Sequence, residues 1–181
     1  MIDNIVARYL EIFPEESNDL TLLQDQIKNK EDLTSRKNFR WHVTASWLVF
    51  WPDKKEVYLI HHKALDKYLQ PGGHMEPEDQ GNPWDTAERE VREEAQLEAQ
   101  IIAIFGDVNI PLDIDTHLIP ANEKKQEPEH FHHDFMYIFQ ASSKKTSLQL
   151  EEVLGGEWMP VDNLPSRFNE ALRKLKFYNK P

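Results

Sequence analysis

Residues 69–97 of this chain read LQPGGHMEPEDQGNPWDTAEREVREEAQL, a stretch in which a glycine-containing bend precedes a segment rich in carboxylates. The second part is predicted to be a helix. Asn82 is a good N-cap, Pro83 suits the first helical position, and Asp85 adds negative charge near the positive end of the helix dipole. Apolar residues recur at helical spacing and predict the face that packs on a sheet, namely Trp84, Ala87, Val91 and Ala95.

Three glutamates lie close together on this predicted helix. Glu90, Glu93 and Glu94 are spaced i, i+3 and i+4, so an α-helix would crowd their carboxylates on one side of about one turn. Mg²⁺ prefers hard oxygen ligands and is usually held by one or two carboxylates together with substrate phosphate oxygens and waters. A helix rich in Glu and Arg is by itself more often a solvated face. The Pro-Gly-Gly bend before it favours a metal site instead.

These residues resemble the signature of the Nudix hydrolase superfamily, which runs Gly, five residues, Glu, seven residues, Arg-Glu, an apolar residue, any residue, Glu-Glu, any residue, Gly and an apolar residue. The positions that follow this pattern are Gly73, Arg89, Glu90, Val91, Glu93, Glu94 and Leu97. Three departures stand out. Asp79 occupies the position of the first Glu, unless the register runs from Gly72 to Glu78. The gap from Asp79 to Arg89 is two residues longer than usual, and Gln96 replaces the closing Gly.

The resemblance extends over roughly residues 36–165 and is similar to one bacterial-type subgroup of these proteins. It rests on the segments His42-Val43-Thr44-Ala45-Ser46, Leu69-Gln70-Pro71-Gly72-Gly73-His74 and His132-His133-Asp134. It implies an α/β fold, a Nudix-type α/β/α sandwich with a mixed central β-sheet. We expect residues 39–181 to form the Nudix hydrolase domain and residues 1–38 to form a helical N-terminal extension.

Hydrophobic patterning predicts the elements around the carboxylate helix. The expected strands are residues 42–51, 56–62, 98–109, 112–119, 130–140 and 157–159, and the expected further helices are residues 2–13, 18–28 and 164–178. The two N-terminal helices are too small to fold alone. They are expected to dock on the main domain or on the second subunit of a homodimer.

The resemblance implies a divalent-metal-dependent hydrolase that cleaves a diphosphate linkage in a nucleoside diphosphate joined to another group, by water attack on phosphorus. Mg²⁺, or Mn²⁺, would be held by Glu90, Glu93, Glu94 and the carbonyl of Gly73. Glu90 and Glu93 are the candidate catalytic residues, with Glu93 either a third ligand or the group that orients the water. Arg89 would support the loop through Asp79 or Glu78.

Other acids and histidines are candidates for the substrate pocket. Glu152 is the candidate for a further acid near the metal, with Glu123, Glu127, Glu129 and Glu151 as competitors. His130, His132 and Asp134 alternate along one strand face, so a zinc site is considered, although strand histidines are more often hydrogen-bonding residues. We expect His132 or Asp134 near the substrate pocket, and His74, directly after the glycines, is a further candidate to face it.

Two rival functions stay open at this point. Asp79, the longer loop and Gln96 leave room for a catalytically weakened Nudix-fold module that only binds nucleotides. The strand histidines leave room for a His-ligated zinc hydrolase, which would retain zinc and lose it on His132→Ala.

The amino-acid composition excludes several classes of binding partner and of chemistry. The formal net charge is −11, from 32 acidic and 21 basic residues, which argues against a nucleic-acid polymer and against an anionic membrane surface. The absence of cysteine excludes disulfides, Cys-ligated zinc and a thiol nucleophile. Because the amino terminus lacks a basic region followed by a long apolar run, a cytoplasmic protein with a small-molecule substrate is expected.

Overall fold

The structure is a computed structural model that describes residues 1–181 except residues 52, 54, 64–65, 124–125, 146–152 and 179–181. Its strands are β1 (Trp41–Phe50), β2 (Glu56–His62), β3 (Lys67–Leu69), β4 (Gly72–His74), β5 (Ala99–Ile101), β6 (Asp113–Ile119), β7 (His130–Ala141) and β8 (Val153–Pro160). Its α-helices are α1 (Ile2–Ile12), α2 (Thr21–Lys28), α3 (Pro83–Glu90) and α4 (Asn169–Tyr178). A π-helical turn, Val91–Ala95, continues α3.

The described strands form one eight-stranded mixed sheet built around β1. β1 pairs in parallel with β7 along its whole length, from Trp41 opposite Phe131 to Phe50 opposite Gln140. The remaining pairs are antiparallel: β2 and β4 with β1, β3 and β8 with β2, and β5 and β6 with β7.

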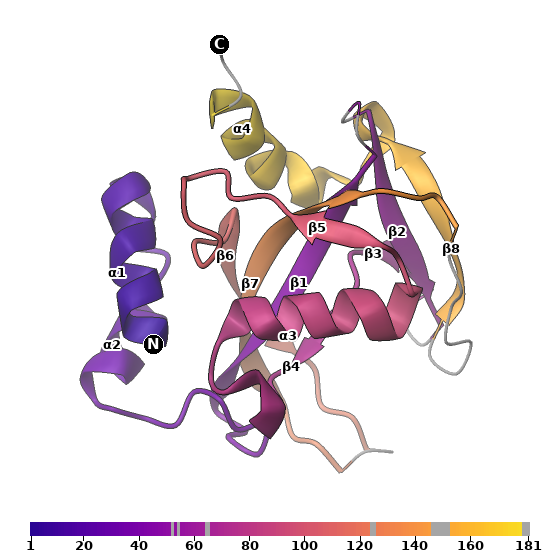
Figure 1. The fold of residues 1–181 in the computed structure, drawn as a ribbon. Coiled ribbons are helices and arrows are strands. Elements are labelled where there is room, and N and C mark those ends of the chain that lie inside the picture. Colours follow the sequence, from indigo (N-terminus) through magenta and orange to yellow (C-terminus); the bar gives the residue numbers. More distant parts are fainter. Residues whose placement is uncertain (52, 54, 64–65, 124–125, 146–152, 179–181) are drawn as a thin grey trace.

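Helices cover both faces of this sheet (Figure 1). One apolar cluster joins residues of α1, α2 and α3 to odd-numbered residues of β1 such as Val43 and Trp47. A second cluster joins Leu48 and other residues of the opposite face to Phe168, just before α4, and to Ala171 and Leu175 within α4. The predicted α/β/α sandwich with a mixed sheet is therefore confirmed.

One face of β1 changes from polar to apolar along its length. Alternation places His42, Thr44 and Ser46 on the same face as Leu48 and Phe50. The apolar end is covered by α4, whereas the polar end is left for a pocket. The parallel strand β7 repeats this change, because its pairing sets His132 beside His42 and Asp134 beside Thr44.

Three element predictions need correction. The strand predicted at residues 98–109 ends at Ile101, and the chain then forms a loop in which Gly106 has a φ of +76° and Asp107 accepts a hydrogen bond from Asn109 N. The C-terminal helix begins at Asn169 because Pro165 starts a separate 3₁₀ turn. The last strand is Val153–Pro160 rather than residues 157–159, and the short strands β3 and β4 were not predicted.

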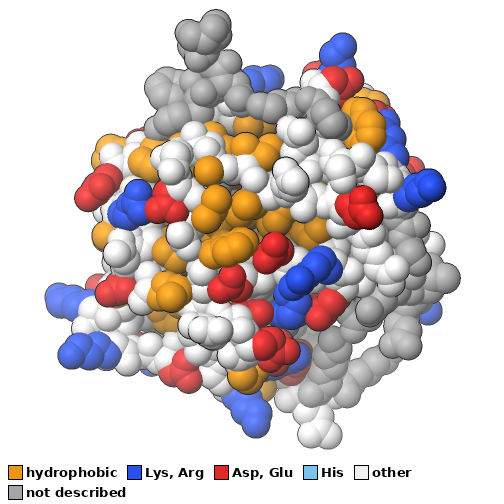
Figure 2. Space-filling model, in the orientation of Figure 1, with side chains coloured by type: hydrophobic (Ala, Val, Ile, Leu, Met, Phe, Trp, Pro, Cys, Tyr) orange, Lys and Arg blue, Asp and Glu red, His pale blue; other side chains and the backbone are white. Residues whose placement is uncertain are grey.

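On the face of the molecule that carries α3, acidic and basic side chains are interspersed around exposed hydrophobic atoms (Figure 2). In the described part of the chain, no helix has both the length and the apolar character needed to cross a bilayer.

Candidate functional site

The glycine bend enters the sheet as β4. Gly72 and Gly73 pair with Ser46 and Ala45 of β1. A Cβ on Gly72 would lie 2.6 Å from the carbonyl oxygen of Ala45, and a Cβ on Gly73 would overlap the carboxylate of Glu90. Only glycine therefore allows this backbone to approach both the central strand and the carboxylates of α3 so closely.

Arg89 ties this bend to α3. Its guanidinium donates to both carboxylate oxygens of Asp79, at 3.0 and 2.9 Å, and to the carbonyl oxygen of His74 at 2.9 Å. Asp79 also accepts from Thr86 Oγ1 and from Glu76 N, each at 2.8 Å. Burial would raise the pKa of Asp79, but these hydrogen bonds outweigh it and hold the pKa below its usual value. The expected contact of Arg89 runs through Asp79, not Glu78.

The three glutamates separate into two groups. Glu90 is largely buried and lines a cavity of about 440 Å³, and Glu94, which lines the same cavity, accepts a hydrogen bond from Gly72 N at 3.1 Å. Glu93 has a side chain that is 53% exposed and pairs with Arg89 at 3.1 Å. The π turn has more residues per turn than an α-helix, so it rotates Glu93 away while Glu94 stays near Glu90.

The opposite wall of the cavity comes from β1 and β7. Thr44 and Ser46 donate to the two carboxylate oxygens of Asp134, at 3.0 and 2.5 Å. His132 and His74 line the same cavity, as does His117. The predicted pocket residues Asp134, His132 and His74 are therefore brought together with Glu90 and Glu94.

Burial shifts the protonation of several of these groups. It raises the pKa of Glu90 against the opposing effect of Arg89, and it raises the pKa of Asp134 against the hydrogen bonds from Ser46 and Thr44. Burial, helped by the neighbouring histidines, lowers the pKa of His132 to about 2. His132 is therefore a neutral imidazole at neutral pH.

The donor set of this cavity suits a hard divalent cation. Among the residues that line it are four carboxylates, those of Glu76, Glu90, Glu94 and Asp134, against one guanidinium, that of Arg36. A diphosphate entering such a cavity would be repelled unless a cation offset the negative charge. The Gly73 backbone also lies close to the Glu90 carboxylate, and backbone carbonyls and carboxylates are both oxygen ligands.

Histidines gather at the end of β1 and β7, but not in the grouping considered from the sequence. The potential ligand atoms of His42, His130 and His132 all lie within 4.8 Å of one another. Asp134 is not in this group, and its carboxylate accepts hydrogen bonds from Thr44 and Ser46 instead. His133, on the other face of β7, bonds to Gln26 Oε1 at 2.7 Å and to Thr116 Oγ1 at 2.8 Å.

Two of the predicted acids have no described position. Glu151 and Glu152 lie outside the described residues, so the structure gives no placement for them. Of their competitors, Glu127 pairs at 3.5 Å with Arg36, which lines the cavity.

The structure adds four residues that were not predicted as site residues, namely His42, Thr44, Ser46 and Arg36. The first three follow one another with the period of two that singled out His130, His132 and Asp134 on β7. That period was therefore an available signal for them, whereas nothing in the sequence separates Arg36 from a solvated surface charge.

The chain is similar to known proteins. The model of the NUDIX domain matches residues 40–180. A curated relative named "Probable DHNTP pyrophosphohydrolase", from Lactococcus lactis subsp. cremoris (strain MG1363), is 31% identical over 150 residues, which cover 82% of this chain and 84% of the relative.

Solved structures agree on the fold. A NUDIX-family hydrolase from Clostridium perfringens has a TM-score of 0.52 and 25% identity, covering 76% of this chain and 96% of that one. An Ap4A hydrolase from C. elegans, in a binary complex, has a TM-score of 0.53 and 16% identity, covering 75% and 96%, and so shows a similar fold alone.

This chain belongs to the NUDIX domain family. The predicted resemblance is thereby confirmed, and so is the predicted class of enzyme, a Nudix pyrophosphohydrolase.

Proposed function

We propose that the protein cleaves a diphosphate linkage in a nucleoside diphosphate joined to another group, with Mg²⁺ or Mn²⁺ as its cofactor. The observation that carries this proposal is the convergence of Glu90 and Glu94 with Gly72 and Gly73 in one cavity. Family membership supports the reaction class, and the oxygen-rich donor set supports the cofactor.

The ion would be held by Glu90, Glu94 and the carbonyl of Gly73, with Glu93 at the edge as a further ligand or as the group that orients water. When bound, it supplies positive charge for the diphosphate and lowers the pKa of a coordinated water. Arg89 and Asp79 position the bend, and the Gly72 amide fixes Glu94.

The reaction itself is a hydrolysis at phosphorus. The water oxygen bonds to phosphorus, the bridging P–O bond breaks, and a glutamate at the site, Glu90 or Glu93, accepts the proton of the water. The products are a nucleoside monophosphate and the phosphorylated remainder. We place the rest of the substrate against His132, His74 and Asp134, which face the same cavity.

The alternative of a module that only binds nucleotides depended on departures from the signature. Asp79 nonetheless makes the paired contact with Arg89, and Gln96 adopts the left-handed conformation usually taken by Gly, with a φ of 46°. These observations favour turnover over mere binding.

A substrate panel tests the proposal. It comprises nucleoside triphosphates, dinucleoside polyphosphates, nucleotide sugars, dinucleotides and, because of the curated relative's name, DHNTP. We expect metal-dependent hydrolysis of at least one diphosphate-linked nucleotide, and a rate at least about 100-fold lower for Glu94→Gln.

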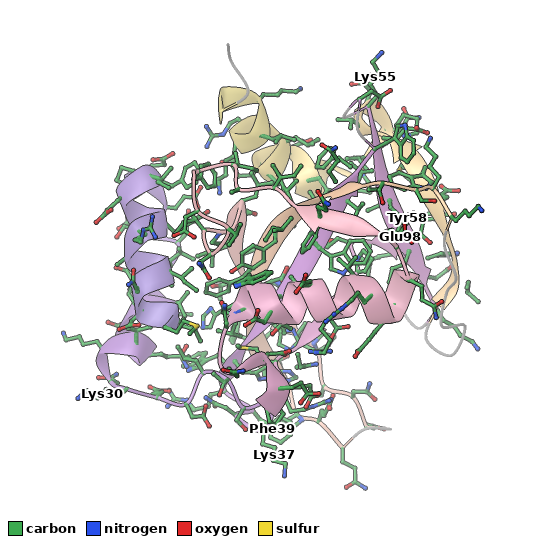
Figure 3. The ribbon with its side chains drawn as sticks, viewed as in Figure 1. Lys30, Lys37, Phe39, Lys55, Tyr58 and Glu98 are labelled. Carbon is green, nitrogen blue, oxygen red and sulfur yellow. The ribbon has the colours of Figure 1, made fainter. Side chains whose placement is uncertain are left out.

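Glu98→Gln is the matched control, because Glu98 is exposed and lies beyond the π turn (Figure 3). Equal turnover by the wild type and Glu94→Gln would refute the metal assignment. Thermal stabilisation by these ligands without any product would favour the binding module.

We also propose a cytoplasmic protein that acts on small molecules rather than on nucleic-acid polymers, and that forms a homodimer. The net charge of −11 supports the choice of partner. Size-exclusion chromatography with light scattering tests the dimer, and a monomeric mass at micromolar concentration would contradict it.

A further inference from the structure

Three imidazoles converge at the polar end of the two central strands. His42 on β1 stands in register with His132 on β7, and His130 is two residues from His132 on the same strand face. The ring centroids are 4.6 Å apart for His42 and His132, 4.9 Å for His130 and His132, and 5.1 Å for His42 and His130.

Backbone carbonyls fix the tautomers of two of these rings. His42 Nδ1 lies 3.0 Å from the carbonyl oxygen of Asn38, and His130 Nδ1 lies 2.8 Å from that of Pro128. A carbonyl oxygen can only accept, so both Nδ1 atoms carry the proton and donate it. In a neutral ring the Nε2 atom is then left with a lone pair. Metal-bound histidines are typically oriented in this way, with the second nitrogen donating to a carbonyl.

The Nε2 atoms of the three histidines lack enough hydrogen-bond donors among them. His130 Nε2 and His132 Nε2 are 3.1 Å apart, and one shared proton can satisfy that pair. His42 is only 1% exposed, and its Nε2 atom is buried with no hydrogen-bond partner among the described residues. A buried polar atom without a partner is destabilising, so an electron-pair acceptor at this point would be stabilising.

We propose that His42, His130 and His132 form a binding site for a transition-metal ion of the zinc class, separate from the carboxylate site. Imidazole nitrogens are ligands of Zn²⁺, whereas Mg²⁺ selects oxygen, so the two donor sets select different ions. Tetrahedral zinc places its nitrogens roughly 3.3 Å apart, given Zn–N bonds of about 2.0–2.1 Å. Small ring rotations would bring these ligand atoms, now within 4.8 Å of one another, to that spacing.

The histidine cluster lies next to the substrate cavity. His132 lines that cavity, and so does His74, whose ring lies 5.0 Å from His42 and 5.1 Å from His132. Three protein ligands leave the fourth position of a tetrahedral ion to water, to His74 or to a group of the bound substrate. The ion would bridge β1 and β7 near Phe39, whose ring centroid lies 6.0 Å from that of His130.

Metal titration of the purified full chain tests this site. After chelation, we expect the wild type to take up one equivalent of Co²⁺ with the visible absorption bands of a four-coordinate nitrogen-ligated ion, and Zn²⁺ to displace it. X-ray absorption of the zinc-loaded protein should show imidazole ligands. His130→Gln and His132→Asn should each weaken Zn²⁺ binding by at least about 10-fold.

Two further variants separate the cluster from other sites. Glu90→Gln/Glu94→Gln removes the proposed carboxylate ligands and should leave the tight Zn²⁺ equivalent in place. His61→Ala removes a histidine that pairs with Asp66 away from the cluster and should do the same.

The proposal is overturned if the wild type shows no four-coordinate Co²⁺ spectrum, or if the zinc equivalent is lost in Glu90→Gln/Glu94→Gln but kept in the His130 and His132 variants. Circular dichroism establishes that each variant is folded. The wild-type spectrum decides the matter even if a variant fails to fold.

Discussion

Gly73 determines how closely the bend can approach Glu90. An added methyl group would overlap the Glu90 carboxylate, so either the bend or the ligand must move. We expect Gly73→Ala to lower kcat/KM by about 100-fold, since displacements near 1 Å have effects of that size. Gly155→Ala is the matched control, because nothing lies within 4 Å of its Cβ position. Steady-state kinetics checks this, and similar losses in both variants would contradict the steric argument.

Glu90 and Glu93 differ in their surroundings more than in their spacing. Both pair with Arg89, but Glu90 is largely buried and lines the cavity, whereas Glu93 is exposed. We expect Glu90→Gln to lower kcat by about 100-fold or more, and Glu93→Gln to lower it by a smaller factor. Activity measured over a range of Mg²⁺ concentrations compares the two. A larger loss for Glu93→Gln would mean that Glu93, not Glu90, is the principal group at the metal.

Asp79 links stability to pH. Its folded-state pKa lies below the usual 3.8, so it contributes stability that is fully present above about pH 4 and is lost as the pH falls through the lower folded-state pKa. We expect Asp79→Asn to lower the free energy of unfolding by about 2–3 kcal/mol at pH 7, because Arg89 loses a buried partner. That difference should shrink below pH 3.8.

Urea unfolding at several pH values measures this effect. Glu78→Gln is the control, because Glu78 is the exposed neighbour that the other register of the signature would have used. A greater loss for Glu78→Gln than for Asp79→Asn would show that the brace does not depend on Asp79.

The spacing of residues in the sequence predicted only some of the contacts between the site residues. The contact of Arg89 with Asp79 follows from the signature, because it links residues of one short segment. The position of His42 beside His132 does not follow from the signature. It depends on the parallel pairing of β1 with β7, and the two residues are 90 positions apart in the sequence. Which strands pair is set by packing of the whole sheet and not by the sequence near either strand.

At the scale of elements, the helix that carries the carboxylates ends in a way that its sequence did not show. Periodicity predicted α3, but the continuation at Val91–Ala95 is a π turn, and the resulting rotation of Glu93 could not be anticipated from α-helical spacing. The strand predicted at residues 98–109 was also too long. Apolar composition does not reveal where a strand ends, and here β5 ends at Ile101, before the loop in which Gly106 has a positive φ.

Gln96 ends this π turn in the left-handed conformation, with φ 46° and ψ 34°. A side chain with a Cβ is strained there by about 1 kcal/mol relative to glycine. We therefore expect Gln96→Gly to raise the free energy of unfolding by about 0.5–1 kcal/mol. Gln100→Gly, in the extended strand β5, should lower it instead. Thermal and urea unfolding of the two variants provide the measurement, and a loss of stability in both would contradict the strain argument.

At the scale of the molecule, Lys174 joins three elements that are distant in sequence. Its buried ammonium group on α4 donates hydrogen bonds to the Tyr9 hydroxyl of α1, at 2.6 Å, and to Asp113 of β6, and it forms an ion pair with Glu16 at 2.6 Å. Burial raises the pKa of Asp113 and Lys174 opposes that rise, so the ionised carboxylate depends on the lysine. We propose that this network, together with the apolar face of α1, makes residues 1–38 part of one cooperative unit with residues 39–181.

Lys174→Met tests that unit. The methionine keeps much of the side-chain volume but leaves Glu16 and Asp113 without their cation, so we expect the free energy of unfolding to fall by about 3–5 kcal/mol. Lys176→Met is the control, because Lys176 is exposed on the same helix and should change stability by less than about 0.5 kcal/mol. Urea unfolding followed by tryptophan fluorescence gives the free energies, and hydrogen exchange should show the amides of α1 and α4 opening together. Such joint opening is expected because tertiary contacts, and not local helix propensity, hold α1 in place. If the amides of α1 alone lost their protection from hydrogen exchange in Lys174→Met, while the sheet kept its stability, residues 1–38 would be a separate unit from the rest of the domain.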